Sequence, residues 1–440
     1  MVKVITYGSF DFLHYGHIRL LKRAKELGDY LIVGVTSDDY DKMRGKINLQ
    51  QSLMERIEAV RATGIVDEII IEEYEGQKID DIKRYNVDVF AIGSDWEGHF
   101  DYLKDYCEVV YLTRTEGVSS SEIREKKCSL RLGMVGDSSF LNKIWKESKA
   151  VNGISVEALC TSNMNCVEKQ DDRNINFVTD DYEEMLEKVD AVYIRSLPDM
   201  HDEHIRQALD AGKHILCESP LLMNELKAHE ILQIAHDRNL VLMEAIKTAY
   251  ATAYNRLLLL IKAGKIGEVI SVDSTCTSIR NTEAIGEWNN IHEWGPTALL
   301  PVLQIMGTDY IECDIATRLR DENKDDFTKI NLLYANGVAS IKIGDRYKAE
   351  GDLIVSGSKG YIYVPSPWWK TDYFEIRYEN PADNKRYFYQ LDGEGIRYEL
   401  VAFVRAIEQG RMTPDINRDV TLSISRIMER FERREKLFLI

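Results

Sequence analysis

The sequence has few cysteines, and they are scattered. The seven stand at positions 107, 128, 160, 166, 217, 276 and 313, with no Cys-x-x-Cys pair and no cysteine–histidine cluster. Such spacing gives no sign of a disulfide framework or of a cysteine-based metal site. We therefore expect reduced, mostly structural thiols, as in a cytoplasmic protein.

The sequence also lacks a long apolar run and an excess of positive charge. The apolar stretch 257–261 is short and flanked by charged residues, so we expect no membrane span. The formal net charge of −17 argues against a nucleic acid or an anionic membrane as partner. Met1 leads directly into a predicted strand, which leaves no room for an N-terminal signal and favours a cytoplasmic location.

The remaining composition is that of a soluble globular protein, with 44% hydrophobic and 29% charged residues. A chain of 440 residues is too long for one hydrophobic core, so we expect two or three domains. No internal repeat or low-complexity segment is present.

Residues 1–127 alternate predicted strands and helices. Strands are expected over 2–7, 30–36, 68–71, 87–92 and 109–112, with helices over 16–27, 53–62, 79–85 and 101–107. This rhythm predicts an α/β domain with a parallel, doubly wound sheet, which binds ligands at the carboxyl ends of its strands.

A His-Tyr-Gly-His motif, 14–17, follows the first of these strands. It stands at the predicted N-terminus of a helix, where unpaired backbone N–H groups and partial positive charge suit a phosphate group. Two imidazoles three residues apart share one helix face and can donate hydrogen bonds to a nucleoside triphosphate. The alternative is a pair of helix-cap or core histidines.

This stretch resembles the nucleotidyltransferase superfamily and, within it, the glycerol-3-phosphate cytidylyltransferases. Two further motifs follow in the family's order. The segment 92–98 reads Ile-Gly-Ser-Asp-Trp-Glu-Gly, and the segment 114–121 reads Arg-Thr-Glu-Gly-Val-Ser-Ser-Ser. Three motifs in the correct order are much more specific than one.

The resemblance implies that a phosphorylated alcohol attacks CTP, giving a CDP-alcohol and pyrophosphate, with Mg²⁺ accompanying the CTP. It implies these catalytic residues: His14, His17, Lys46 and Arg114. It implies these nucleotide-binding residues: Gly8, Ser9, Phe10, Asp11, Arg44, Asp95, Trp96, Thr115, Gly117, Ser119 and Ser120. Arg56 and Asp67 are the candidates for acceptor binding, and Asp11 is the candidate Mg²⁺ ligand.

Some of these residues have other interpretations. Arg44 and Lys46 lie in a polar loop and could be solvated surface, Ser119 and Ser120 could cap a helix, and Trp96 could belong to the core.

Gly64 stands where glycerol-3-phosphate enzymes often carry an arginine. The acceptor is therefore glycerol 3-phosphate or another polyol phosphate, with Arg61 as a candidate substitute for the missing guanidinium.

A new strand pattern begins after residue 128. From there the chain resembles the Gfo/Idh/MocA oxidoreductases, through landmarks at 190–194, 198–201, 211–220, 264–269 and 402–410. The resemblance implies a Rossmann-like domain over 129–248 and an α/β domain with a large, mostly antiparallel sheet over 249–440. We expect a homodimer, with this sheet as its candidate interface.

The residues that carry out hydride transfer in that family are missing. The phosphate-binding fingerprint reads Gly-Asp-Ser-Ser-Phe-Leu over 136–141, and no acidic residue follows the second strand at 161–163. Arg195 replaces a small residue, Ser219 the usual lysine and Thr297 the proton-transferring histidine. We therefore expect no turnover of NAD(P)H, leave NAD(P) binding open, and interpret this half as an inactive, oxidoreductase-like domain. The alternatives are a bifunctional enzyme that also makes or consumes the alcohol phosphate, and a non-enzymatic scaffold.

Overall fold

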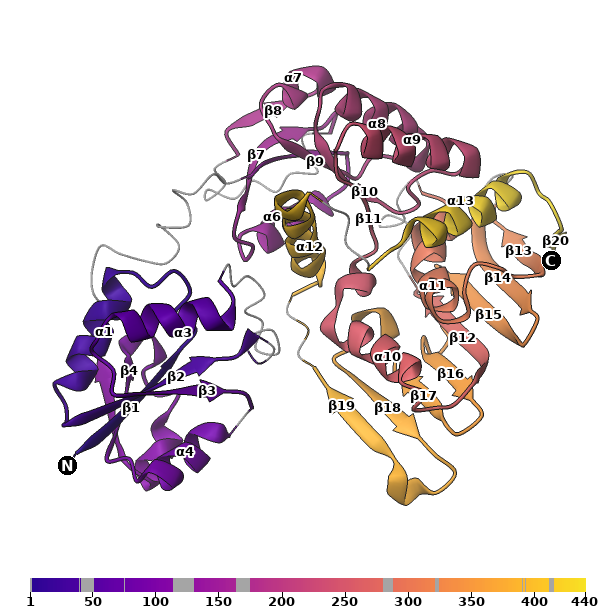
Figure 1. Ribbon diagram of the computed structural model, residues 1–440. Helices are drawn as coiled ribbons and strands as arrows, with labels where there is room; N and C mark the ends of the chain where they lie inside the picture. The colour runs from indigo at the N-terminus through magenta and orange to yellow at the C-terminus, as the bar shows by residue number, and fades with distance from the viewer. Residues whose placement is uncertain are drawn as a thin grey trace. The chain divides into compact units, whose positions relative to one another are not determined.

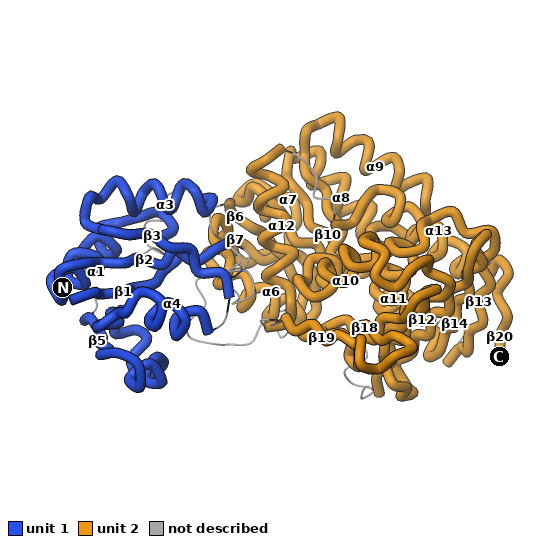
Figure 2. Tube along the Cα trace, turned by 60° about the horizontal axis from the view of Figure 1, so that its bottom comes forward, with its two compact units in different colours: residues 1–129 blue, residues 130–440 orange. Residues whose placement is uncertain are grey.

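The computed structural model describes residues 2–38, 40, 51–74, 76–113, 130–163, 175–279, 288–320, 324–389, 391, 393–410 and 415–440. The chain divides into two compact units, Met1–Ser129 and Leu130–Ile440 (Figure 2). Among the described residues, every helix is too short or too polar to cross a lipid bilayer.

The first unit is built on a five-stranded parallel sheet in the order β3-β2-β1-β4-β5 (Figure 1). Its strands are β1 (Lys3–Gly8), β2 (Tyr30–Thr36), β3 (Glu68–Glu72), β4 (Val89–Gly93) and β5 (Glu108–Leu112). Its helices are α1 (Tyr15–Lys25), α3 (Leu53–Ala62) and α4 (Gln77–Tyr85), with the 3₁₀ turns η1 (Ser94–Trp96) and η2 (Asp101–Asp105). The prediction of a parallel α/β domain is confirmed, and the helix expected over 101–107 is the short 3₁₀ turn η2.

Both faces of this sheet are covered, because its central strands are apolar on both sides. Val4 of β1 and Leu31 of β2 pack in one core, with Leu21 of α1. Ile5 and its neighbours pack in a second core, with Ile82 of α4. β1 and β4 are neighbours, although the chain proceeds from β1 to β2 and from β4 to β5 on opposite sides. The topological switch point, where doubly wound sheets bind ligands, therefore lies at the carboxyl ends of β1 and β4.

The second unit begins with a six-stranded parallel sheet in the order β11-β10-β9-β6-β7-β8. The strands are β6 (Leu130–Val135), β7 (Ile154–Cys160), β8 (Phe177–Thr179), β9 (Ala191–Ile194), β10 (His214–Glu218) and β11 (Leu242–Ala245). Their connections contain α6 (Leu141–Ser148), α7 (Tyr182–Leu186), η4 (Pro198–Met200), α8 (His201–Asp210) and α9 (Glu225–Asp237). The switch point of this sheet lies between β6 and β9.

A nine-stranded sheet follows, in the order β19-β18-β17-β16-β12-β15-β14-β13-β20. Its strands are β12 (Val269–Thr277), β13 (Glu312–Leu319), β14 (Asp325–Tyr334), β15 (Gly337–Gly344), β16 (Leu353–Gly357), β17 (Tyr361–Val364), β18 (Tyr373–Arg377), β19 (Lys385–Phe388) and β20 (Leu437–Leu439). All pairs are antiparallel except β12 with β15 and β13 with β20. This confirms the predicted large, mostly antiparallel sheet.

The remaining helices and turns of the second unit follow β11 or lie in the chain between strands of the nine-stranded sheet. They are η5 (Lys247–Tyr250), α10 (Thr252–Lys262), α11 (Asn290–Met306), η6 (Trp368–Lys370), η7 (Pro381–Asp383), α12 (Ile396–Gln409) and α13 (Arg418–Glu432). α11 packs on β12, β14 and β15, whereas α12 packs against α6 and α13 against α9 (Figure 1). A buried pair joins α6 to α12, with Arg397 Nε 2.9 Å from Glu147 Oε2. The expected division into 129–248 and 249–440 stays a prediction, since the C-terminal helices pack on both parts.

Candidate active site

The first histidine of the motif caps helix α1. His14 has extended backbone angles and its Nδ1 accepts a hydrogen bond from the backbone N–H of Gly16 at 3.1 Å. A neutral imidazole that accepts at Nδ1 carries its proton on Nε2. The capping role, which the sequence left as an alternative, therefore assigns His14 a donor at Nε2.

His17 lies one helical turn further along α1. Its ring stacks on that of His14, with centroids 3.9 Å apart and planes 23° from parallel. The ring of Phe10 meets His17 edge-on at 5.5 Å. Both imidazoles are partly exposed and lie where the chain leaves β1, at the switch point of the sheet. The structure thus brings the two predicted catalytic histidines together.

The loop between β1 and α1 is bent by two residues in the left-handed region. Phe10 has φ 52° and Phe12 has φ 46°, values that residues other than glycine rarely adopt. The Phe10 ring folds back over Gly8, where an added Cβ would lie 3.1 Å from the ring. Phe12 is held because its N–H donates to Gln51 Oε1 at 2.7 Å.

Arg56, predicted to bind the acceptor, is fully buried beneath this loop. Its guanidinium donates to the carbonyls of Ser9 at 2.6 Å and Thr36 at 2.9 Å, and its Nε donates to the carbonyl of Gln51 at 3.2 Å. It also pairs with the carboxylate of Asp38. These contacts join the ends of β1 and β2 to the start of α3, which is a positioning role.

Asp11 is also buried, and its Oδ1 accepts a hydrogen bond from the Gln51 N–H at 3.1 Å. Among the described residues, no group of three or more histidine, cysteine or acidic side chains could hold a metal ion. Mg²⁺ with a nucleotide usually needs only one or two carboxylates, since phosphates and waters supply its other ligands. The role of Asp11 as a Mg²⁺ ligand stays a prediction.

Asp67, the second predicted acceptor-binding residue, lies just before β3. Its carboxylate is 2.5 Å from the Lys25 ammonium and accepts a hydrogen bond from the Leu31 N–H at 2.7 Å. It therefore lies at the amino ends of the strands, whereas the histidines lie at the carboxyl ends. Its contacts join α1, β2 and β3, and we leave it out of the proposed site.

Asp95 and Trp96, two of the predicted nucleotide-binding residues, lie at the end of β4, next to β1. Asp95 is exposed in the turn η1, and Trp96 is half-buried. The indole of Trp96 packs against Phe100 with centroids 5.9 Å apart and meets His99 edge-on at 5.7 Å. Asp95 and Trp96 are thus at the correct edge of the sheet, and their nucleotide contacts stay a prediction.

Seven predicted site residues lie outside the described part of the chain: Arg44, Lys46, Arg114, Thr115, Gly117, Ser119 and Ser120. The last described residue before the second group is Thr113. Arg23 of α1 donates to the Thr113 carbonyl at 2.7 Å and to its hydroxyl at 3.0 Å. This contact fixes the chain to α1 one residue before Arg114.

Sequence reasoning missed Gln51 and Arg23. Gln51 bonds to Asp11, Phe12 and Arg56 through three different groups, and so ties the histidine loop to α3. The only sequence signal near it is Ser52 with Glu55, which form a capping box at the start of α3. Contacts of this kind join residues far apart in the chain and leave no local pattern.

At the switch point of the second unit, a carboxylate joins two loops by hydrogen bonds. The Asp137 carboxylate accepts hydrogen bonds from the Thr161 hydroxyl at 2.8 Å, the Ser162 N–H at 2.7 Å and the Asn163 N–H at 3.1 Å. Burial would raise the pKa of Asp137, but these hydrogen bonds lower it below its usual value. A fixed negative charge thus joins the loops after β6 and β7, between which a dinucleotide would place its ribose and phosphates.

Backbone N–H groups at the start of α6 donate hydrogen bonds to residues of the preceding turn. The Leu141 N–H donates to the Ser138 carbonyl and the Asn142 N–H to the Ser139 carbonyl, both at 3.1 Å. Phe140 N–H donates to the Ser138 hydroxyl at 3.2 Å. In a dinucleotide site the pyrophosphate lies against the backbone N–H groups at this end of the helix.

Arg195 fills the other side of this switch point. Its guanidinium carbon lies 3.9 Å from the centroid of the Trp288 ring and 5.4 Å from that of Phe140. An added Cβ at Gly136 would lie 2.5 Å from the Arg195 carbonyl, so this first fingerprint glycine is required by packing between β6 and β9. The described residues therefore do not fit the pyrophosphate of a dinucleotide.

Ser219, at the position of the missing lysine, and two histidines of the second unit have structural contacts. Ser219 is buried and its hydroxyl bonds to the Glu244 carboxylate. His201 lies between the Pro220 and Ser196 carbonyls, at 3.0 and 3.1 Å, and burial lowers its pKa to about 4. His292, in α11, pairs with Glu432 at 2.9 Å.

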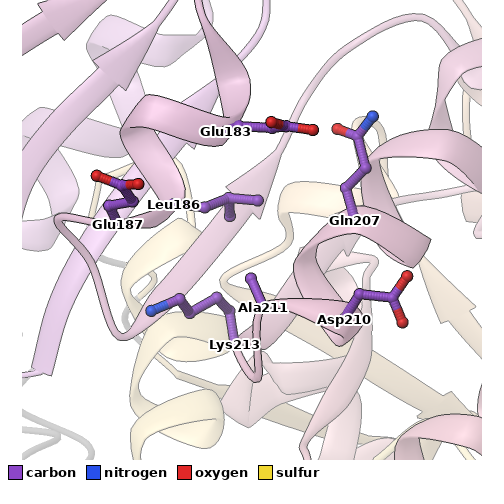
Figure 3. A pocket seen from close by; sticks show the side chains of 7 residues that line it. All are labelled: Glu183, Leu186, Glu187, Gln207, Asp210, Ala211 and Lys213. Atoms are coloured by element: carbon purple, nitrogen blue, oxygen red, sulfur yellow. The ribbon is translucent and has the colours of Figure 1, made fainter.

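Figure 3 shows a depression on the surface of the second unit, lined by Glu183, Leu186, Glu187, Gln207, Asp210, Ala211 and Lys213. It lies around α7 and α8, at the amino ends of β9 and β10. Lys213 donates to the Val189 carbonyl at 2.9 Å, and three of the other lining side chains are acidic. We assign no ligand to it.

Comparison with known proteins agrees with the geometry of the first unit. The family model described as cytidylyltransferase-like matches residues 5–126. The glycerol-3-phosphate cytidylyltransferase of Bacillus subtilis is 51% identical over 130 residues, which are 30% of this chain and 100% of that protein. The enzyme of the same name from Staphylococcus aureus is 49% identical over 130 residues, 29% of this chain and 95% of its own length. The chain belongs to the cytidylyltransferase-like family. It is a nucleotidyltransferase, as the His-x-Gly-His motif predicted.

The second unit carries a second family assignment. The model of the Gfo/Idh/MocA oxidoreductase family, with its NAD-binding Rossmann fold, matches residues 130–246 of this nucleotidyltransferase. The 3-ketoreductase KijD10 from Actinomadura kijaniata, solved with NADP and TDP-benzene, superposes with a TM-score of 0.63 at 18% identity. The match covers 71% of this chain and 99% of that one, and at this identity it shows the fold alone.

Proposed function

We propose that the first unit transfers the cytidylyl group of CTP to glycerol 3-phosphate or a related polyol phosphate, releasing pyrophosphate. The observation that carries the proposal is the stacked pair His14 and His17 at the switch point of the sheet. The similarity to glycerol-3-phosphate cytidylyltransferases over their whole length supports the same reaction.

In this reaction an oxygen of the acceptor phosphate attacks the α-phosphorus of CTP in line, and pyrophosphate leaves. Little covalent chemistry is required, so catalysis consists of positioning and of neutralising charge on the phosphates. The Nε2–H of His14 donates to a phosphate oxygen, and His17 supplies a second donor on the same face. Lys46 and Arg114 are proposed to add positive charge.

The polar contacts beneath the loop keep these donors in place. Arg56 and Gln51 hold the carbonyl of Ser9 and the N–H of Phe12, on either side of the strained Phe10. On the other face, Tyr7 donates to Asp81 at 2.9 Å and fixes the end of β1 to α4. Mg²⁺ bound with CTP would lower the negative charge that these residues must balance.

The acceptor is tested by measuring pyrophosphate release with CTP and a panel of phosphorylated polyols. Glycerol 3-phosphate is expected to be used, and a better polyol phosphate would be explained by Gly64 in place of an arginine. The His17→Ala protein serves as the control for contaminating activity. A clear preference for ATP over CTP would contradict the proposal.

We further propose that the second unit does not transfer hydride. Asp137 and Arg195 occupy the switch point, and Ser219 and Thr297 replace the acid–base groups of the resembled oxidoreductases. The bifunctional alternative predicts instead that NADH or NADPH is oxidised in the presence of a keto form of the acceptor. The absorbance of NADH or NADPH distinguishes the two proposals, because it falls only if the cofactor is oxidised.

A further inference from the structure

Cationic side chains gather where β9, β10 and β11 end in the second unit. Arg195 follows β9 and Lys247 begins η5, while Lys143 projects from the first turn of α6. All three charged groups lie close to one aromatic ring, that of Phe140. The guanidinium carbon of Arg195 is 5.4 Å from the ring centroid, and the ammonium nitrogens of Lys247 and Lys143 are 5.8 and 5.9 Å from it.

An internal carboxylate lies among these cations. Lys143 is 3.4 Å from Glu394 Oε1 and Lys247 is 3.6 Å from Glu394 Oε2. Lys370 of η6 also donates to Oε2. Burial would raise the pKa of Glu394, but Lys370 and the other two ammonium groups lower it to about 2. Three cations thus converge on one side chain, which comes from a short turn between Gly393 and Gly395.

The cluster carries more positive than negative charge. Its cations are Lys143, Arg195, Lys247 and Lys370, and the carboxylates facing them are Glu394 and Glu218, the latter 3.9 Å from Arg195. Burial and the charge of Glu218 raise the pKa of a third carboxyl group, Glu399, well above the usual range, and burial raises the pKa of Glu218 as well. Burial and the neighbouring Lys370 ammonium lower the pKa of Lys247. Within the described residues, the buried Nε of Arg195 has no hydrogen-bond partner.

Tyr193 explains how Glu218 and Glu399 coexist. Its hydroxyl oxygen is 2.8 Å from Glu218 Oε1 and 2.9 Å from Glu399 Oε1. A hydroxyl has one proton to donate, so the second carboxyl group must hold its own. Glu218 and Glu399 therefore share at least one proton and together add at most one negative charge beside the four cationic side chains.

We propose that this cluster binds the phosphate group of a small phosphate monoester, and that the Glu394 carboxylate takes the place of that phosphate in the ligand-free protein. A phosphate monoester carries close to two negative charges at neutral pH, with three oxygens for several donors. The faces of Trp288 and Phe140 offer apolar contact for the carbon part. A dinucleotide is not accommodated, because Asp137 and the first turn of α6 close its pyrophosphate position.

The test is calorimetric titration of the full chain with inorganic phosphate, glycerol 3-phosphate, malonate and NADH. Glu394→Gln removes the internal competitor and is expected to tighten one phosphate site by about tenfold, the effect of roughly one lost ion pair. Lys247→Gln and Arg195→Gln are expected to weaken the same site by about tenfold or more. Glu379→Gln removes an exposed charge in a turn after β18 and is the matched control. It should leave the isotherm unchanged.

Thermal unfolding of every variant shows whether its fold is intact. Lys143→Gln, at a half-exposed position, replaces Lys247→Gln if that buried variant fails to fold. Binding by the first unit is common to all variants, so only a site that responds to Glu394, Lys143, Lys247 or Arg195 counts. Unchanged or weaker phosphate binding by folded Glu394→Gln overturns the proposal, as does equal affinity for malonate or micromolar binding of NADH at the same site.

Discussion

Arg56 donates a hydrogen bond of 2.6 Å to the carbonyl of Ser9, the residue that follows β1. Ser9 precedes Phe10, whose left-handed backbone turns the chain toward the histidines. Arg56 is fully buried, and its other partners are Thr36 of β2, Asp38 and Gln51. The histidine loop therefore depends on a side chain that does not itself reach the switch point.

The first prediction follows from this contact. Arg56→Gln should lower the free energy of unfolding of the protein by about 2–4 kcal/mol, because three carbonyls and the Asp38 carboxylate lose their donor. Urea denaturation measures the change. Arg61→Gln, an exposed change of the same kind on the same helix, should cost less than about 0.5 kcal/mol. Equal stability of the two variants would contradict the positioning role.

The second prediction concerns the imidazoles. His17→Ala should reduce the turnover of pyrophosphate release by roughly a hundredfold or more, the usual effect of losing a donor to developing charge. Its melting temperature should stay close to that of the original protein, since the ring is partly exposed. His236→Ala, at an exposed position of α9, is the control. A folded His17→Ala protein with normal turnover would make the pair purely structural.

The third prediction distinguishes two roles of His14, capping helix α1 and donating a hydrogen bond to the nucleotide. His14→Asn keeps a side chain that can cap α1, because asparagine is among the preferred N-cap residues. It should therefore preserve stability while losing at least about tenfold in turnover, since the Nε2 donor is removed. His14→Ala should lose stability as well, by about 1 kcal/mol. Equal turnover of His14→Asn and the original protein would assign His14 to capping alone.

The fourth prediction is a pH dependence of stability in the second unit. Burial lowers the pKa of His201 to about 4, whereas an unfolded histidine titrates near 6.5. Between these values the unfolded chain binds a proton that the folded chain does not, so stability falls as the pH falls from about 6.5 to 4. His201→Gln should flatten the curve in this window, measured by urea denaturation at each pH. An unchanged slope would mean that His201 is not the group responsible.

The fifth prediction concerns the nicotinamide cofactor. Titration of the full chain with NADH and NADPH should give no saturable heat at concentrations up to about 100 μM, at which a cofactor site of micromolar affinity would be nearly full. Absorbance should not change when the acceptor panel and its keto forms are added. Micromolar binding with substrate-dependent oxidation would support the bifunctional enzyme instead.

The sequence predicted the fold of the first unit well, because its strands and helices have a regular hydrophobic pattern. The His-x-Gly-His motif is local, so its place at the end of β1 followed directly. The role of Arg56 could not be predicted in this way, since it depends on Ser9, Thr36 and Asp38 meeting in space. Asp67 was placed in the site by its neighbourhood in the sequence, although it lies at the opposite ends of the strands.

In the second unit the sequence predicted what is missing better than what replaces it. The absence of glycines at 138 and 141 was visible, and so was the charge of Asp137. Its hydrogen bonds to the loop after β7 were not, because that loop follows more than twenty residues later. The convergence of Lys143, Lys247 and Lys370 on Glu394 likewise joins four separate segments and has no counterpart in any short motif.

Gly136 shows that a glycine of the dinucleotide fingerprint can be required by the fold itself. Any side chain there would push into the carbonyl of Arg195 and force β6 and β9 apart, whether or not a dinucleotide is bound. A glycine retained for packing looks the same in a sequence as one retained for a cofactor. Loss of cofactor binding alone would therefore leave this glycine in place, because the sheet itself requires it.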